Sequence, residues 1–173
     1  MTIFERLARV KAFVLDVDGV LTDGRVLVNE SGEQWRSFHT RDGYAMQLAV
    51  KKQYPFTVIS GGRSQGVAKR LQGLGIQDVV LDCSDKLSAL KAWAKTKNLP
   101  LEEILFMGDD VPDLPLLKAV GLPCCPVDAI PDVQAQCVYV SPVKGGYGAV
   151  RDVLEKVMRL QQRWEDNDHI KSI

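Results

Sequence analysis

"KAFVLDVDGVLTDG", residues 11–24, begins as an apolar segment and ends in a cluster of carboxylates. Residues 12–15 are all apolar, which is typical of a strand buried on both faces. Asp16, Asp18 and Asp23 follow directly, around a glycine. Unpaired carboxylates a few ångströms apart repel one another, so such a cluster indicates a metal, a bound proton or a reaction that uses the carboxylates.

Composition narrows the class of protein. The chain has 173 residues, 22 of them basic and 22 acidic, so we expect one domain spanning residues 1–173 and no excess of positive charge for nucleic acid. The N-terminus has no leader-like apolar stretch and no run of 18 apolar residues occurs, which predicts a cytoplasmic protein without a membrane partner. Four cysteines without C-x-x-C spacing predict reduced thiols and no zinc site.

Short apolar runs alternate with helical patterns along the chain. Strands are predicted at residues 12–16, 56–60, 78–82, 103–109 and 137–141. Helices are predicted at residues 42–53, 64–75, 85–98, 111–121 and 147–164. This alternation predicts an α/β fold with a doubly wound parallel sheet, followed by a loose tail at residues 165–173.

One segment interrupts the alternation. Residues 25–40, "RVLVNESGEQWRSFHT", contain two alternating stretches around "NESG", which predicts a small β-hairpin inserted after the first strand. The hairpin carries Trp35 and Phe38, which either pack against another subunit or cover their own domain.

Polar residues follow the apolar runs, where ligands bind in such sheets. They are Asp16 and Asp18, then Ser60, Gly61 and Gly62, then Asp85 and Lys86, and finally Asp109, Asp110 and Asp113. Carboxylates from two loops suit Mg²⁺, and a lysine and a serine beside them suit a phosphoryl group.

Asp16 and Asp18 fit two chemical roles. A carboxylate can attack phosphorus to form an acyl phosphate, and a second one can protonate the leaving oxygen and then activate water. If Asp18 continues the strand, both side chains face the same way. We therefore expect Asp16 to be the nucleophile and Asp18 the general acid/base.

These motifs also admit other interpretations. A calcium loop counted from Asp16 would need glycine sixth and glutamate twelfth, but the glycine is fourth and the twelfth residue is Leu27. A receiver-type phospho-acceptor module, which is not an enzyme, is an alternative because the third run contains Asp82. A structural oligomer with an inactive site is a further alternative, although clustered carboxylates are costly without a use.

The motifs "DVDGVLTDG", "ISGG", "DK" and "GDDVPD" resemble those of the haloacid dehalogenase superfamily in order and spacing, from residue 12 to about residue 155. More narrowly, "FHTRDGYAM" at residues 38–46 and "KGGYGAVRDV" at residues 144–153 resemble the 3-deoxy-D-manno-octulosonate 8-phosphate phosphatases of the capless branch. The resemblance implies a magnesium-dependent phosphomonoester hydrolase that acts through an aspartyl phosphate in the synthesis of the inner sugar of lipopolysaccharide.

The resemblance also implies roles for single residues. Asp16 matches the nucleophile and a metal ligand, Asp18 the acid/base that also gives its carbonyl to the metal, and Asp109 the remaining protein ligand. Ser60 and Lys86 match the groups that hold the phosphoryl oxygens. Asp110 and Asp113 match acids that lie behind the metal ligands, and Asp113 orients the metal waters or Lys86.

Sugar binding is implied in the same way. The substrate-binding positions that match are Asp18, His39, Thr40, Arg41, Asp42, Gly43, Gly61, Gly62, Arg70 and Lys86. Structural roles are the alternatives: a salt bridge between Arg41 and Asp42, a solvated Arg70, and a hydrogen-bonded His39. The family implies a homotetramer built through the hairpins, with residues 144–150 as a lid over a neighbouring subunit's site.

One position departs from the family pattern. Many members carry arginine where this chain has Gly62, and here the arginine, Arg63, comes one residue later. A related phosphatase for nine-carbon keto-deoxy sugar acid 9-phosphates carries an acidic residue at the position of Gly62. The glycine favours the eight-carbon substrate and leaves the nine-carbon acid as an alternative.

Overall fold

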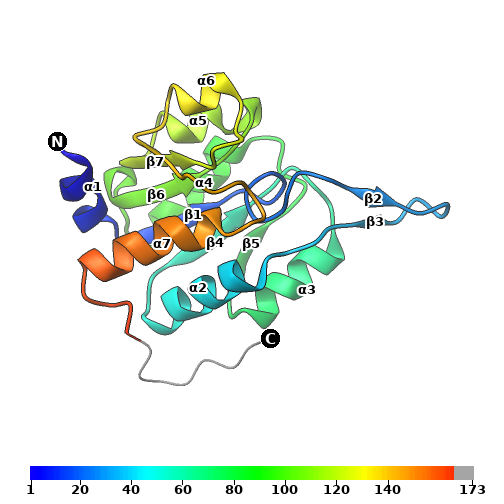
Figure 1. The fold of residues 1–173 in the computed structure, drawn as a ribbon, viewed down its shortest axis with the longest axis horizontal. Coiled ribbons are helices and arrows are strands. Elements are labelled where there is room, and N and C mark those ends of the chain that lie inside the picture. The colour runs from blue at the N-terminus through cyan, green and yellow to red at the C-terminus, as the bar shows by residue number, and fades with distance from the viewer. Residues whose placement is uncertain (166–173) are drawn as a thin grey trace.

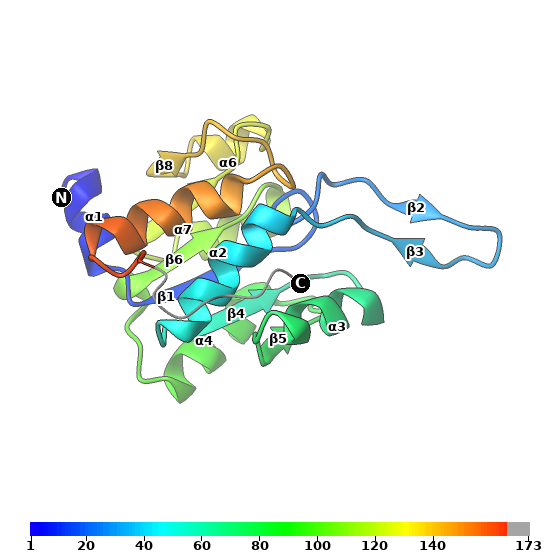
Figure 2. The same cartoon turned by 60° about the horizontal axis from the view of Figure 1, so that its bottom comes forward.

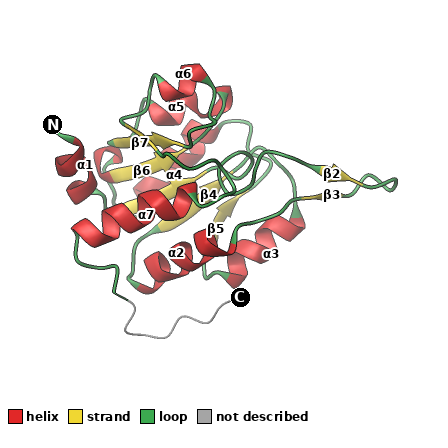
Figure 3. Cartoon of the chain, viewed as in Figure 1, coloured by secondary structure: helices red, strands yellow, loops and turns green. Residues whose placement is uncertain are grey.

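The computed structural model describes residues 1–165, so the expected loose tail lies outside the described residues except for Glu165. A six-stranded parallel sheet with the order β5-β4-β1-β6-β7-β8 forms its centre (Figures 1 and 3). The strands are β1 (Ala12–Leu15), β4 (Phe56–Ile59), β5 (Asp78–Val80), β6 (Ile104–Met107), β7 (Leu122–Cys125) and β8 (Tyr139–Val140). The α-helices are α1 (Ile3–Arg9), α2 (Thr40–Lys51), α3 (Gln65–Gly73), α4 (Lys86–Thr96), α5 (Leu114–Leu117), α6 (Pro131–Gln134) and α7 (Ala149–Leu160). Short 3₁₀ helices are η1 (Leu101–Glu103) and η2 (Val111–Asp113).

Hydrophobic cores lie on both faces of the sheet. Phe13 and Leu15 of β1 pack into a core with α1, α2, α3 and α7, whereas Ala12 and Val14 pack into one with α4, α5 and α6. All four side chains are fully buried, because successive residues of a strand point to opposite faces. The predicted doubly wound α/β fold is confirmed.

The connection between β6 and β8 differs from the prediction. The helix expected at residues 111–121 is only η2 and the single turn α5, because Pro112 and Pro115 lack the N–H groups that a continuous helix needs. Strand β7 was not predicted, because its segment "LPCC" contains Pro123, and proline is uncommon inside a sheet. The Pro123 carbonyl still accepts a hydrogen bond from the Val138 N–H beside it.

The inserted hairpin projects from the body of the molecule (Figures 1 and 2). Its paired strands are short, β2 (Leu27–Val28) and β3 (Gln34–Trp35), with Leu27 opposite Trp35. Phe38 packs against the core of its own domain, but Trp35 is 57% exposed and Leu27 69%. The two aromatic residues therefore have different surroundings.

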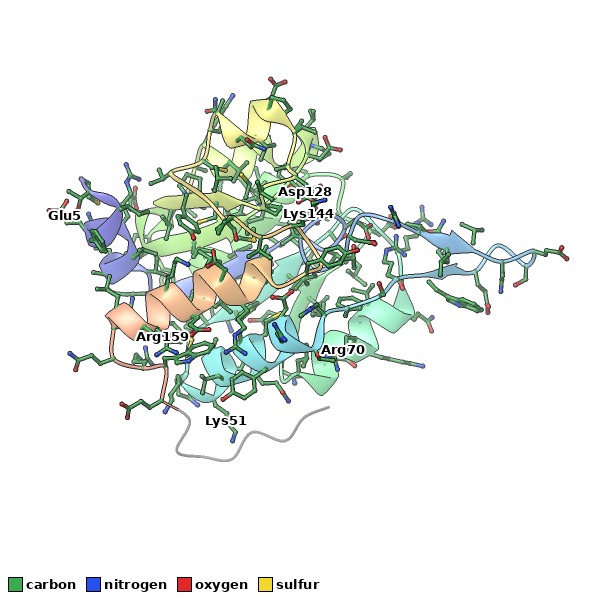
Figure 4. All side chains as sticks on the ribbon, viewed as in Figure 1. Glu5, Lys51, Arg70, Asp128, Lys144 and Arg159 are labelled. Atoms are coloured by element: carbon green, nitrogen blue, oxygen red, sulfur yellow. The ribbon has the colours of Figure 1, made fainter. Side chains whose placement is uncertain are left out.

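Two glycines near the C-terminal helix pack on the loop after β1. The Gly146 N–H donates to the Val20 carbonyl, and the Gly145 N–H donates to the Asp128 carboxylate. Figure 4 shows Asp128 and the neighbouring Lys144 close together above the start of α7. Residues 144–150, expected to act as a lid on a neighbouring subunit, thus contact the first loop of their own chain. Among residues 1–165, no helix combines the length and the apolarity needed to cross a bilayer.

We expect Gly145→Ala to destabilise the protein. A Cβ at this position would lie 1.7 Å from the Gly19 carbonyl oxygen, so two backbone segments would have to separate. Overpacking of this kind costs about 1–3 kcal/mol. Chemical denaturation measures the free energy of unfolding. Gly73→Ala is the matched control because nothing beyond its chain neighbours and its own helix backbone lies within 4 Å of its Cβ position, so no such loss is expected. Equal unfolding free energies for the two variants would contradict the packing described.

Candidate active site

The predicted polar residues, apart from Asp85, line one cavity at the carboxyl ends of β1, β4, β5 and β6. Asp85 instead caps α4, where its carboxylate accepts a hydrogen bond from the Ser88 N–H. The cavity has a volume of about 680 Å³. Its lining comprises Asp16, Asp18, Gly24, Ser60, Gly61, Gly62, Cys83, Ser84, Lys86, Asp109, Asp110, Pro112, Asp113 and Pro115. Four separate loops contribute, because parallel strands bring their carboxyl ends to one edge of the sheet.

Asp16 is a buried residue in the lining of this cavity. It is the first residue after β1, and its N–H donates to the Met107 carbonyl on β6. The residue is 6% exposed, and its Oδ2 lies 3.0 Å from the Lys86 Nζ. Its other oxygen, Oδ1, is buried and has no hydrogen-bond partner among the described residues. Such an oxygen is available for a cation or for attack on a substrate.

Lys86 and Asp113 form a buried ion pair beside Asp16. Lys86 begins α4, and its Nζ lies 2.7 Å from the Asp113 Oδ1. The other oxygen of Asp113 accepts a hydrogen bond of 3.0 Å from the Asp109 N–H. Because both oxygens are engaged, Asp113 fits a role in holding Lys86 and the Asp109 loop better than a role as a metal ligand.

The site holds more negative than positive charge. Carboxylate oxygens of Asp16, Asp109 and Asp113 lie within 4.8 Å of one another. Burial, and then repulsion from Asp113, raises the pKa of Asp16 to about 7. Burial, and then repulsion from Asp16 and Asp113, raises the pKa of Asp109 to about 7. Burial lowers the pKa of Lys86, but attraction to Asp16 and Asp113 outweighs this and raises it.

The donor set fits a magnesium ion. Asp16 Oδ1 is a buried oxygen without a partner, and Asp109 faces the same cavity. Gly19, whose φ is +80°, lets the Asp109 carboxylate approach the loop after β1, since a Cβ at Gly19 would lie 1.9 Å from the Asp109 Oδ2. Oxygen ligands on two loops, with room for waters, suit Mg²⁺. Asp110 lines the cavity too, but is exposed, and its Oδ1 accepts from the Val111 N–H.

Asp18 differs from the sequence-based expectation. Strand β1 ends at Leu15, and Asp18 lies in the turn that follows, so it does not share a strand face with Asp16. Both residues still line the cavity. The Asp18 carboxylate accepts two hydrogen bonds from Arg36, at 2.6 Å from Nε and 3.1 Å from Nη2. Arg36 could not be predicted as a site residue, because nothing in the hairpin sequence distinguishes it from a solvated arginine.

Ser60 follows β4 and is 3% exposed. Its N–H donates to the Val80 carbonyl on β5, and its Oγ accepts a hydrogen bond of 3.1 Å from the Gly62 N–H. Residues 60–62 therefore form a tight turn at the wall of the cavity. Asp82, on which the receiver alternative depends, is not among the lining residues and pairs instead with Arg63 at an exposed position.

Of the residues expected to bind the substrate, Asp18, Gly61, Gly62 and Lys86 line this cavity. The other six lie outside it, in two groups around the start of α2: His39, Thr40, Arg41, Asp42, Gly43 and Arg70. His39 is the N-cap of α2, and its Nδ1 accepts from the Arg41 N–H. Asp42 is 1% exposed and accepts a hydrogen bond of 2.7 Å from the Arg151 N–H, at the start of α7. Burial raises the pKa of Asp42, and this hydrogen bond opposes the rise. Within the chain, His39 and Asp42 thus have structural contacts.

Gly43 and Arg70 form the other group. A Cβ on Gly43 would lie 2.7 Å from the Arg70 Nη2, so the glycine leaves room for the guanidinium. Figure 4 shows Arg70 on α3, beside the N-terminal end of α2. Thr40 and Arg41 are exposed at the same helix start. Substrate binding by His39, Thr40, Arg41, Asp42, Gly43 and Arg70 stays a prediction.

The sequence of this chain is similar to those of known hydrolases. A family model of haloacid dehalogenase-like hydrolases matches residues 72–154. The 3-deoxy-D-manno-octulosonate 8-phosphate phosphatase of Yersinia pestis is 32% identical over 163 residues, covering 94% of this chain and 87% of that protein. The phosphatase of the same name from Escherichia coli (strain K12) is 30% identical over 164 residues, covering 95% of this chain and 87% of that one.

Solved structures agree with these relatives. The crystal structure of the Yersinia pestis phosphatase superposes with a TM-score of 0.91, covering 93% of this chain and 87% of that one at 32% identity. That of the Moraxella catarrhalis phosphatase, in complex with a magnesium ion, a phosphate ion and a KDO molecule, superposes with a TM-score of 0.89 at 31% identity. It covers 92% of both chains. The chain therefore belongs to the haloacid dehalogenase-like hydrolases, in the family of the 3-deoxy-D-manno-octulosonate 8-phosphate phosphatases.

Proposed function

We propose that this chain is a magnesium-dependent phosphatase that releases phosphate from 3-deoxy-D-manno-octulosonate 8-phosphate. The observation that carries the proposal is the partnerless Oδ1 of Asp16, buried in a cavity beside Lys86 and facing Asp109. The substrate is inferred from the relatives named above, which are 30–32% identical over most of the chain. The magnesium, phosphate and KDO bound by the Moraxella catarrhalis protein agree with the same chemistry.

In the first half of the proposed reaction, Asp16 is the nucleophile. Its Oδ1 attacks phosphorus, an acyl phosphate bond forms, and the bond from phosphorus to the sugar oxygen breaks. Asp18 gives its proton to that oxygen, so the sugar leaves as an alcohol. Lys86 and Ser60 hold the phosphoryl oxygens. A magnesium ion held by Asp16, the Asp18 carbonyl and Asp109 would offset negative charge and orient the phosphoryl group.

In the second half, Asp18 acts as a base. It takes a proton from water, the water oxygen bonds to phosphorus, and the bond between phosphorus and Asp16 breaks. Phosphate leaves, and both carboxyl groups return to their starting states. Asp113 has a supporting role, because its two oxygens hold Lys86 and the Asp109 loop.

The finer expectations about assembly are part of the same proposal. Exposed apolar side chains on the hairpin, Leu27, Val28 and Trp35, support a homotetramer that buries them. A lid formed by residues 144–150, a single domain over the whole chain and a cytoplasmic location stay predictions.

We expect phosphate release to depend on the sugar and on magnesium. The assay uses a panel of sugar phosphates that includes the eight-carbon and nine-carbon keto-deoxy acids, each with Mg²⁺ and with a chelator. The eight-carbon acid should be hydrolysed fastest, with activity lost in chelator. Faster release from the nine-carbon acid would contradict the proposed substrate. No release from any compound would contradict the proposed enzymatic function.

We expect the metal-free protein to lose stability as pH rises. Asp16 and Asp109 have a pKa of about 7 in the fold and an ordinary value of 3.8. Between these values the unfolded chain releases protons that the folded chain keeps, so stability falls through this window and is lowest above about pH 7. Mg²⁺ should remove most of this loss because it stabilises the carboxylates.

Thermal unfolding from about pH 5 to about pH 8, with chelator and with Mg²⁺, measures this effect. Asp109→Asn is the control. It removes one of the two carboxyl groups whose pKa is raised, so in chelator its melting temperature should fall less steeply as pH rises. If the melting temperature followed pH identically with and without Mg²⁺, the assigned charge balance would be wrong.

A further inference from the structure

Arg36 has an unusual position for a hairpin residue. Its Nε and Nη2 contact the two oxygens of Asp18 at 2.6 and 3.1 Å, and its side chain is only 6% exposed. A forked pair of this kind fixes the plane of a carboxylate as well as its position. Arg36 directly follows β3, so the base of the hairpin is tied to the loop after β1.

Asp18 depends on this contact for its orientation. It lies in a turn outside β1, where no strand ladder fixes its backbone. In residues 1–165, Arg36 is the one side chain that hydrogen-bonds to the Asp18 carboxylate. The Asp18 side chain is 35% exposed, so without Arg36 it would have space to rotate.

Gly62 is the third residue at the contact between Arg36 and Asp18. A Cβ on Gly62 would lie 3.4 Å from both the Arg36 Nη2 and the Asp18 Oδ2, and 3.5 Å from the Ser60 Oγ. These are ordinary van der Waals distances, so Gly62 lies directly beside the ion pair and the proposed phosphoryl-binding serine.

We infer that Arg36 is a positioning residue for Asp18: it holds the carboxylate toward the leaving oxygen and links the hairpin to the acid/base. The inference rests on the proposed function, since it needs Asp18 to transfer protons. A carboxylate that is free to rotate spends less time within reach of the leaving oxygen, which lowers the rate of the chemical step. Substrate affinity changes little because Arg36 acts through Asp18.

The first test is steady-state kinetics of Arg36→Met with the best substrate of the panel. We expect kcat to fall by about 10-fold or more and KM to change by less than about 3-fold. Arg36→Lys should recover part of kcat, because an ammonium can contact an oxygen of Asp18 but cannot form the fork. Arg25→Met is the matched control, since Arg25 is exposed on the other arm of the hairpin and should keep wild-type values.

A double-mutant cycle separates positioning from a merely structural role. If Arg36 acts through Asp18, adding Arg36→Met to Asp18→Asn costs no further activity. Independent, multiplicative losses would overturn the inference. So would an unchanged kcat in Arg36→Met, or a raised KM with an unchanged kcat, which would make Arg36 a substrate ligand.

Crystal structures of the wild type and of Arg36→Met provide a readout that does not need activity. The Asp18 carboxylate should have one orientation in the wild type and several in the variant. A single, unchanged orientation in the variant would overturn the inference. Failure of the proposed function would be seen separately, as a wild-type protein that releases no phosphate from any compound.

Discussion

Repulsion among buried carboxylates at the carboxyl ends of β1 and β6 is the constraint on which the site depends. Asp16, Asp109 and Asp113 share this space with one ammonium group, that of Lys86. Asp113 uses both oxygens to hold Lys86 and the Asp109 N–H. Burial, and then repulsion between these carboxylates, raises the pKa values of Asp16 and Asp109. A divalent cation suits these carboxylates, and a phosphoryl group suits the ammonium of Lys86 beside them.

The fold keeps the repelling groups together by close backbone packing. Gly19 leaves room for the Asp109 carboxylate, and a Cβ on Gly108 would lie 2.5 Å from the Asp113 Cβ. Gly145 packs on the Gly19 carbonyl from the far end of the chain. At each contact the glycine has no side chain to hold the neighbouring group away. The free energy gained by burying the two cores of the sheet therefore keeps the carboxylates close together.

Much of this site could be predicted from sequence because its signals are local. An apolar run followed by Asp16, Ser60 or Asp109 marks a strand end, and strand ends of a parallel sheet converge. The short β7 was missed because Pro123 hides its strand pattern. Asp18 and Arg36 could not be paired in advance, because their contact joins a turn to an insertion 18 residues away. The hydrogen bond from the Arg151 N–H to Asp42 likewise joins residues 109 positions apart, whereas the N-cap formed by His39 is a local contact.

Asp16→Asn tests most directly the claim that the fold tolerates an unfavourable charge for chemistry. The amide removes the charge that burial and Asp113 disfavour, while Lys86 keeps its contact with Asp113. In chelator at about pH 8 the variant should therefore melt at a higher temperature than the wild type, and with Mg²⁺ it should release no phosphate. A lower melting temperature would contradict the charge balance, and retained turnover would contradict the nucleophile.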